Sequence, residues 1–516
     1  MSPGSKIFYS RTLPILFGVF IVSVILRLPN LDRPLSKHHE FCTAIALRIV
    51  QIWDAEGIEK FGRNPVMNYP GAENKYINNY ANTSGDMVDA EGNYYYVSHP
   101  PFAYYLPYYV FTVLNINPTV LSLQVLNMLL HFLSGLFIYM TVCLLSKTRV
   151  RGQVFAPALV AFLFYIFAPP TMWFQSNVYM ADMLVHVIFI IGLYTALKMI
   201  IRERFSTFKY LFAFFLSIFL MVYTSWLGFF FTFALLIYGF VRLQDNTGFF
   251  IPIALAMLAT SIAIVLIIYQ YSSINGFDAY FREAAMRFGM RSSFSGASSV
   301  TGWISEKINQ VVLLFFNYAV NYGHIILLIG VLIFQTFKKK MPKLEFSENG
   351  YRFIWLSSLP VILLHLVFLN YSGQDFSVLY ASAFYAVLMG IMYDKMKAVF
   401  AKRSLQMWMA GILVLGVFMY YFVNRPGSES IKGFKYSHYR EIAREMKSEI
   451  EGGEVLFVSG YKPDPQLITE MRRNIKQVKS EEEAIKFLKF RDLSDGILFN
   501  SEADGSIREI VRIKNE

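Results

Sequence analysis

Two carboxylates could do acid–base chemistry beside a membrane, Glu40 and Asp182. Glu40 directly follows His38 and His39, and Asp182 lies at the edge of a long apolar run. A carboxylate beside an acceptor can take the proton from an attacking hydroxyl. An ionisable side chain at the edge of a span is also a functional candidate, because burying it in lipid is costly. The structural alternatives are a glutamate favoured by a helix dipole and an aspartate that caps a helix.

Basic side chains could hold a phosphate group near these carboxylates. Arginine suits this task because its planar guanidinium can bind two phosphate oxygens at once. Arg287 and Arg291 are four residues apart and so share one face of a helix, where Glu283 could pair with Arg287. An ordinary surface ion pair is the alternative explanation for each arginine. The full set of candidates is Arg63, Lys75, Arg282, Arg287 and Arg291.

A divalent metal is a further candidate, because several residues with nitrogen or oxygen ligands occur in the same regions. They are His38, His39, Glu40, His99 and Asp182. Adjacent residues on a helix point about 100° apart, so two neighbouring histidines would rarely bind one ion. The sequence therefore leaves the metal undecided.

Membrane helices must position these side chains. Of the 516 residues, 55% are hydrophobic and 16% are charged, and the mean hydropathy is +0.41. Soluble globular proteins have about 25% charged residues, so a soluble enzyme is excluded. A membrane span needs roughly 20 apolar residues. The sequence predicts eleven spans, at about 12–27, 119–145, 154–172, 177–201, 209–224, 226–243, 248–271, 311–336, 351–369, 376–393 and 405–423.

The positions of lysine and arginine predict the orientation of these spans. With the N-terminus inside, the basic loops all face the cytoplasm, as the positive-inside rule requires. Counting residues 102–114 as a span, or merging 209–243 into one helix, would place the later basic loops outside. We therefore expect 102–114 to be a juxtamembrane segment. Three polar regions then face the outside, namely residues 28–118, residues 272–310 and everything after residue 423, including the C-terminus.

The chain is predicted to divide into a membrane domain, residues 1–424, and a small soluble α/β domain, residues 425–516. In the second domain, 439–450 and 481–490 have helical patterns, whereas 454–458 and 496–499 resemble strands. This domain has as many basic as acidic residues, so the net charge of +11 lies in the membrane domain. Loops that face anionic lipid explain that charge, and no nucleic acid is expected as a partner. Because no catalytic constellation is visible in the second domain, an accessory or acceptor-docking role is favoured.

The motifs of the outer loops resemble those of the C-type (GT-C) membrane glycosyltransferases. The similarity rests on Glu40 just past the first span, an aromatic run that closes on His99-Pro100-Pro101, and Asp182 at the outer end of a later span. The protein O-mannosyltransferase-like and aminoarabinose transferase-like families are the most similar. The turn Thr224-Ser225-Trp226-Leu227-Gly228 is also similar to one in these enzymes. One departure is that the family often has Asp-Glu or a lone Asp where this chain has His39-Glu40.

The resemblance implies inverting transfer of a hexose or pentose from a polyprenyl-phosphate donor to an acceptor hydroxyl or amine. Glu40 would be the base or orient the acceptor, and Asp182 would support it. His39, His99 and the basic candidates would contact substrate. The acceptor could be a protein, a lipid or a polysaccharide. The resemblance further implies an integral protein of the bacterial inner membrane that contacts membrane lipids and has its active site on the periplasmic side.

Transport of a lipid or amphiphile is the alternative function. Transporters and flippases usually place ionisable groups and broken helices near the middle of the bilayer. Here the predicted spans carry almost no charge at depth, and the polar regions lie outside. This pattern favours chemistry at the outer surface. The Ser- and Gly-rich residues 292–301 could act as a lid in such an enzyme or could be only a flexible loop.

Overall fold

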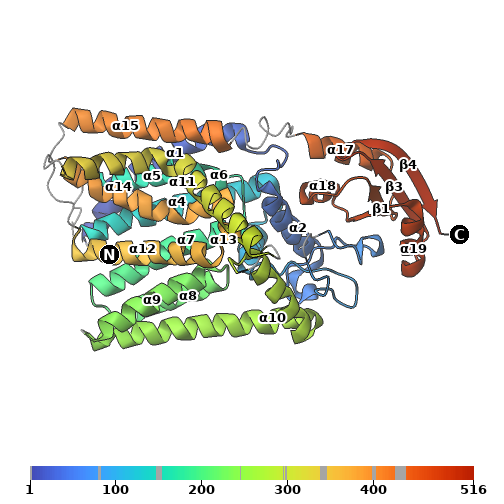
Figure 1. Ribbon diagram of the computed structural model, residues 1–516, viewed down its shortest axis with the longest axis horizontal. Helices are drawn as coiled ribbons and strands as arrows, with labels where there is room; N and C mark the ends of the chain where they lie inside the picture. The colour runs from blue at the N-terminus through green and yellow to red at the C-terminus, as the bar shows by residue number, and fades with distance from the viewer. Residues whose placement is uncertain are drawn as a thin grey trace.

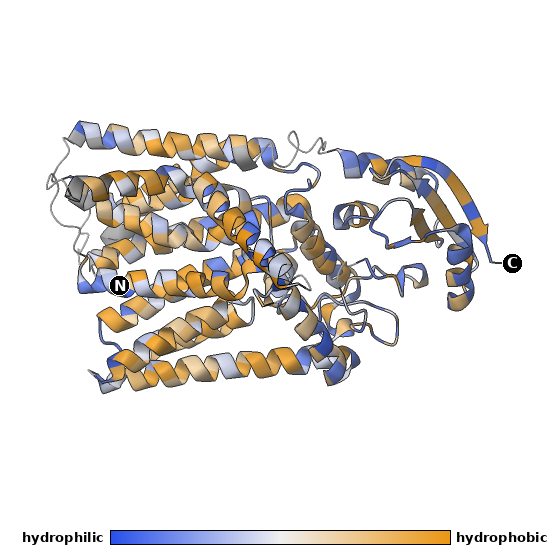
Figure 2. Cartoon of the chain, viewed as in Figure 1, coloured by the Kyte–Doolittle hydropathy of each residue, from blue (hydrophilic) through white to orange (hydrophobic). Residues whose placement is uncertain are grey.

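The computed structural model describes residues 3–515 except 80–82, 147–153, 245, 295, 297–298, 338–345, 398–401 and 425–436. Within this part of the chain, seven helices are long and apolar enough to cross a membrane, and five shorter apolar helices accompany them. Apolar residues dominate the whole bundle, whereas polar residues gather toward the other end of the molecule (Figure 2). The predicted class, a helical membrane bundle with a small soluble α/β domain, is confirmed. The count of eleven spans and their orientation stay predictions.

Each predicted span contains a helix of the bundle. One span, 154–172, is divided in the structure, because Pro169 and Pro170 stop the first helix and start a second, α6 (Pro169–Phe174). The others are α1 (Pro3–Arg27), α4 (Val120–Leu145), α5 (Ala156–Ile166), α7 (Ala181–Ile201), α8 (Phe208–Val222), α9 (Leu227–Leu243), α10 (Phe250–Arg291), α11 (Val300–Phe337), α12 (Glu348–Val367), α14 (Ser382–Met396) and α15 (Lys402–Met419).

Short helices form the layer outside the bundle. α3 (Phe102–Leu114) is the predicted juxtamembrane segment, and α2 (Glu40–Glu56) precedes it. Phe41, Ile45, Ile49 and Ile52 recur at helical spacing, which predicts that α2 lies along the membrane surface on one apolar face. Instead it is buried on most sides, because it packs between the bundle and the C-terminal domain (Figure 1). The remaining pieces are η1 (Leu28–Asn30), η2 (Ile58–Phe61), η3 (Ala72–Asn74), η4 (Thr247–Phe249), α13 (Leu369–Ser372), η5 (Asp375–Ala381) and η6 (Tyr420–Asn424).

Helix α10 continues past its membrane span and bends there. The backbone leaves helical geometry at Asn275 and at Gly276, where φ is +83° and ψ is 168°. Only glycine adopts this combination readily. Residues 277–291, which we expected in an outer loop, then form a second helical arm that carries Arg282, Arg287 and Arg291.

The C-terminal domain is a four-stranded sheet with helices. Strand order is β2-β1-β3-β4, with β1 parallel to both of its neighbours and β4 antiparallel to β3. The predicted helices and strands appear as α17, β1, α19 and β3, whereas α18, β2 and β4 were not predicted. The predicted boundary at 424/425 adjoins residues outside the described part. The elements are α17 (His438–Ser448), β1 (Val455–Ser459), α18 (Pro465–Met471), β2 (Ile475–Gln477), α19 (Glu481–Arg491), β3 (Asp495–Ser501) and β4 (Ile507–Lys514).

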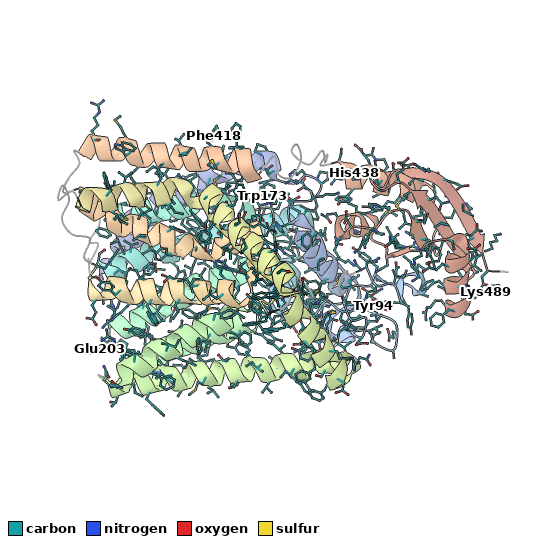
Figure 3. The ribbon with its side chains drawn as sticks, viewed as in Figure 1. Tyr94, Trp173, Glu203, Phe418, His438 and Lys489 are labelled. Carbon is teal, nitrogen blue, oxygen red and sulfur yellow. The ribbon has the colours of Figure 1, made fainter. Side chains whose placement is uncertain are left out.

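This domain is attached to the first outer loop by hydrogen bonds as well as apolar contacts. Gln466 Nε2 donates to the carbonyl of Ser36 over 2.8 Å, and Thr469 Oγ1 donates to that of Ala44 over 3.1 Å. His438 and Lys489 mark the domain at one end of the molecule, and Glu203 marks the opposite end of the bundle (Figure 3). The layer around α2 therefore lies between the bundle and the domain.

Gly276→Val should lower the stability of the protein by about 1–3 kcal/mol, because a β-branched residue is strained at this φ and ψ. Among the described residues, no atom beyond the adjoining backbone lies within 4 Å of the position that a Cβ would take, so backbone strain is the expected cause. Gly289→Ala, in the helical part of the same arm and equally open, is the matched control and should be neutral or slightly stabilising. Thermal unfolding in detergent measures both. Equal melting of the two variants would contradict the role of the bend.

Candidate functional site

A cavity of about 620 Å³ lies between the C-terminal domain and the ends of the bundle helices nearest to it. The bundle side of its wall carries most of the ionisable residues. The domain side is formed by α17, the segment before α18 and the first residues of α18. From the bundle side come His99, Asp182, Arg287, Arg291 and Tyr371, from α2 and the residues before it Lys37, Phe41, Cys42 and Ile45, and from the domain Tyr439, Lys462, Asp464 and Gln466.

Asp182 stands in the first turn of α7 and is almost fully buried, with 3% of its side chain exposed. Hydroxyl groups compensate its charge: Ser225 donates to Oδ1 over 3.0 Å, Tyr380 donates to Oδ1 over 2.6 Å, and Tyr371 donates to Oδ2. Among the described residues, Oδ2 thus accepts one hydrogen bond, although a carboxylate oxygen can accept two. Asp182 therefore keeps an acceptor position for a group in the cavity.

His99 lies beside Asp182 and is held neutral. Its Nε2 is 3.4 Å from Arg291 Nη2, which can only donate, and its Nδ1 is 3.5 Å from Ser225 Oγ. Burial lowers the pKa of His99 to about 4, against the opposing effect of the Asp182 carboxylate. A neutral ring with its proton on Nδ1 fits both neighbours. His99 is thus an uncharged hydrogen-bonding group at neutral pH.

Two arginines from the bent arm of α10 reach the cavity. Arg291 donates to the carbonyl and the hydroxyl of Ser98, over 3.0 and 2.7 Å, and its guanidinium lies 5.0 Å from the centre of the Tyr371 ring. Arg287 donates to Glu283 over 2.7 Å, which confirms the pair expected from their spacing. Both guanidinium groups remain part of the cavity wall, so they give this wall a positive character.

Glu40 is placed differently from Asp182. Its carboxylate accepts two hydrogen bonds from Arg33, over 2.7 and 2.9 Å, and a third from the backbone N–H of Ser36. The side chain is fully buried and is not among the described residues that line the cavity. The structure thus gives Glu40 an ion pair at the start of α2, although we expected a position facing substrate.

The other candidates also divide between the cavity and its surroundings. Arg63 and Arg282 are exposed and form ion pairs with Glu59 and Asp86, over 2.8 Å in each case. Lys75 donates to Asn93 Oδ1 over 2.5 Å, and His39 Nε2 lies 2.7 Å from Asp375 Oδ1. None of these four candidates is among the described lining residues. Glu59 is only four residues from Arg63, whereas the partners of Arg282, Lys75 and His39 are distant in the sequence and depend on how the loops fold back.

Sequence reasoning missed the tyrosines that bind Asp182. Tyr371 lies in the short turn that we expected between the spans 351–369 and 376–393, and Tyr380 lies near the start of the second of these spans. Burial and the neighbouring carboxylate raise the pKa of Tyr371 well above its ordinary value, so the phenol stays a donor. Ser225 belongs to the Thr224–Gly228 turn, which the resemblance had singled out without assigning it a role. Uncharged outward residues near a membrane carboxylate were the available signal.

The fold resembles solved structures of membrane glycosyltransferases. The AglB oligosaccharyltransferase of Archaeoglobus fulgidus, in complex with an inhibitory peptide and a dolichol-phosphate, matches with a TM-score of 0.58 and 10% identity, over 95% of this chain and 70% of that one. ArnT of Cupriavidus metallidurans in the apo state gives 0.56 and 12%, over 95% and 94%. ArnT bound to undecaprenyl phosphate gives 0.53 and 13%, over 97% and 94%. No protein-family model and no curated protein matches the sequence. The chain therefore has the GT-C fold, as its motifs predicted.

Glu40→Gln should destabilise the protein by about 3–5 kcal/mol, because Arg33 then stays buried without its carboxylate. Replacing both residues, as in Arg33→Met with Glu40→Met, should restore much of the stability. Glu59→Gln, which breaks the exposed pair with Arg63, is the control and should cost less than about 1 kcal/mol. Thermal unfolding in detergent measures all three. A Glu40→Gln variant that melts like the unmodified protein would refute a structural ion pair.

Proposed function

We propose that this protein is an inverting glycosyltransferase that moves a sugar from a polyprenyl-phosphate donor to an acceptor hydroxyl or amine. The observation that carries this proposal is the position of Asp182, which offers one acceptor site to a cavity that two arginines also line. The GT-C fold supports it, since one ArnT structure holds undecaprenyl phosphate and one AglB structure holds a dolichol-phosphate. These ligands suggest a lipid-linked donor.

Asp182 is the group that we assign to the acceptor. Three hydroxyl donors stabilise its ionised form, so the carboxylate can orient an acceptor O–H or N–H by accepting a hydrogen bond at Oδ2. As the acceptor attacks the anomeric carbon, its proton becomes acidic and can pass to the same oxygen. Glu40, which the sequence suggested as the base, instead fixes the start of α2 through Arg33 in this proposal.

Arg287 and Arg291 are the groups that we assign to the donor. The bond from the anomeric carbon to the phosphate oxygen breaks as the acceptor bond forms, and the electron pair leaves with the phosphate. Cationic donors stabilise that growing charge. A single displacement of this kind inverts the anomeric carbon. Apolar lining residues, among them Phe41, Ile45 and Met290, suit the first part of an isoprenoid chain.

The surroundings of the cavity support a reaction at the outer face of the membrane. The cavity lies at the end of the bundle that carries the C-terminal domain, opposite the end with Glu203 (Figure 3). The positive-inside rule makes the Glu203 end cytoplasmic, so the reaction would occur on the periplasmic side of a bacterial inner membrane. Hexoses and pentoses both remain candidates for the sugar, as proteins, lipids and polysaccharides do for the acceptor.

Transport of a lipid is less well supported. Arg27 and His131 form a buried contact in the bundle, with Arg27 Nη1 and His131 Nδ1 3.1 Å apart. A transport path would favour such ionisable groups near the middle of the bilayer. Arg27, however, is the last residue of α1, and Asp182 is in the first turn of α7. Both therefore lie at helix ends beside the outer layer rather than along a path through the bundle.

Asp182→Asn should reduce glycosyl transfer by about 100-fold or more, because the amide cannot accept the acceptor's proton. Membranes that contain the variant would be given a panel of undecaprenyl-phosphate-linked hexoses and pentoses, and release of undecaprenyl phosphate would be followed. Asp54→Asn, an exposed carboxylate on α2, is the matched control and should leave transfer unchanged. Transfer by Asp182→Asn within a few-fold of the unmodified rate would rule out the assigned role.

Arg291→Gln should weaken the binding of undecaprenyl phosphate by about 10-fold or more, as expected when one charge-assisted hydrogen bond is lost. Arg282→Gln is the matched control, because Arg282 lies on the same arm of α10 but outside the cavity. Competition against a labelled lipid phosphate in detergent measures both affinities. Equal losses in the two variants would mean that general charge, and not a phosphate site at Arg291, attracts the lipid.

A further inference from the structure

A group of two histidines and one aspartate lies just behind the cavity wall. His38 Nε2 is 2.6 Å from Asp375 Oδ2, and His39 Nε2 is 2.7 Å from Asp375 Oδ1. Ligand atoms of the three side chains all lie within 4.8 Å of one another. The group joins the start of the first outer loop to the start of η5, more than 300 residues later in the sequence.

The backbone explains how two adjacent histidines can face one carboxylate. His39 has a φ of +58° and a ψ of 1°, in the left-handed region, and it precedes α2 as its N-cap. The 100° separation expected for neighbours on a helix therefore does not apply to this pair. A left-handed conformation is uncommon for a residue other than glycine, and it persists where the surroundings impose it. Here its effect is to bring both imidazoles to Asp375.

Packing fixes the two rings in place. The His38 ring stacks on Trp173, with ring centres 5.0 Å apart and planes 24° apart. The edge of the His39 ring meets Phe376, with centres 5.2 Å apart. Ligand side chains that are held by packing lose little freedom when an ion binds. The side chains of His39 and Asp375 are 18% and 28% exposed, so an ion can also reach them.

We propose that His38, His39 and Asp375 bind a first-row transition metal ion of the Zn²⁺ type. Two imidazole nitrogens and one carboxylate oxygen are a ligand set that zinc accepts, with a fourth position left for water. Metal–ligand distances of about 2.0–2.2 Å in a tetrahedral site separate the ligand atoms by about 3.3 Å. The two His–Asp spacings of 2.6 and 2.7 Å must therefore widen by about 0.6–0.7 Å, and any spacing in the group above about 3.3 Å must shorten. Each imidazole must also carry its proton on Nδ1 instead of Nε2.

The ion would connect two parts of the cavity wall. Lys37 precedes His38, while Gln374 and Phe376 flank Asp375, and all three of these neighbours line the cavity. A metal at this position would hold the first outer loop against the segment after α13. Glu40, although adjacent in sequence, does not belong to the set, since Arg33 and the N–H of Ser36 occupy its oxygens. The inference stands independently of glycosyl transfer.

Metal uptake by the full chain tests this inference. Protein without a polyhistidine tag would be purified in detergent, stripped with a chelator, dialysed against ZnCl₂ and analysed for bound zinc. One zinc per chain is expected, together with a higher melting temperature in the presence of Zn²⁺. Asp375→Asn, which keeps the size of the side chain, should lower the zinc affinity at least 10-fold and abolish the shift. His438→Ala removes a histidine of α17 that contacts the carbonyl of Asp504, and it should retain the zinc.

Three outcomes would contradict the proposed metal site. Absence of stoichiometric zinc in the folded unmodified protein would overturn the proposal, and so would undiminished uptake by Asp375→Asn. Cobalt provides a measurement that needs no variant, because Co²⁺ in a site with nitrogen and oxygen ligands and four-fold coordination absorbs visible light far more strongly than hydrated Co²⁺. A spectrum like that of the hydrated ion in the Co²⁺-loaded protein would also overturn the proposal.

Discussion

The structure of the site depends on keeping one carboxylate charged where almost no water reaches it. Transfer of an ionised carboxylate into an apolar environment is very costly unless hydrogen bonds replace its hydration. Asp182 obtains these bonds from three hydroxyl groups on three segments: the turn between α8 and α9, helix α13 and η5. Loss of any donor would leave part of that cost uncompensated. The requirement of a single charge therefore fixes the relative positions of four segments, which together form the bundle side of the cavity.

Local patterns in the sequence were enough to predict the framework. The length of an apolar run must match the thickness of the membrane, so the helices lie close to their predicted positions. Pro169 and Pro170 account for the division of 154–172. Short apolar runs identified β1 and β3, and helical patterns identified α17 and α19. The short strand β2 and helix α18 have only three and seven residues, too few to establish a period. Strand β4 is mostly exposed, with an irregular pattern of burial.

The site was predictable only in part, because it depends on contacts between residues that are far apart in the sequence. Asp182, Arg287 and Arg291 could be singled out as charges next to membrane spans. Glu40 looked equivalent to Asp182 in the sequence, and the difference between them is that Arg33 folds back onto Glu40. Tyr371 is 189 positions away from the carboxylate that it binds, and no spacing rule links such residues. Types of residue thus indicate which groups could react, whereas packing decides which of them meet.

The cavity wall has a consequence for the order in which the molecule is made. Its lining begins at Lys37 and ends at Gln466, so residues from nearly the full length of the sequence meet at it. During synthesis the bundle helices leave the ribosome before the C-terminal domain, which supplies the opposite side of the cavity. The last part of the chain can settle on α2 only afterwards, through Gln466 and Thr469. A nascent chain that ends before α18 therefore lacks part of the cavity wall that faces the bundle.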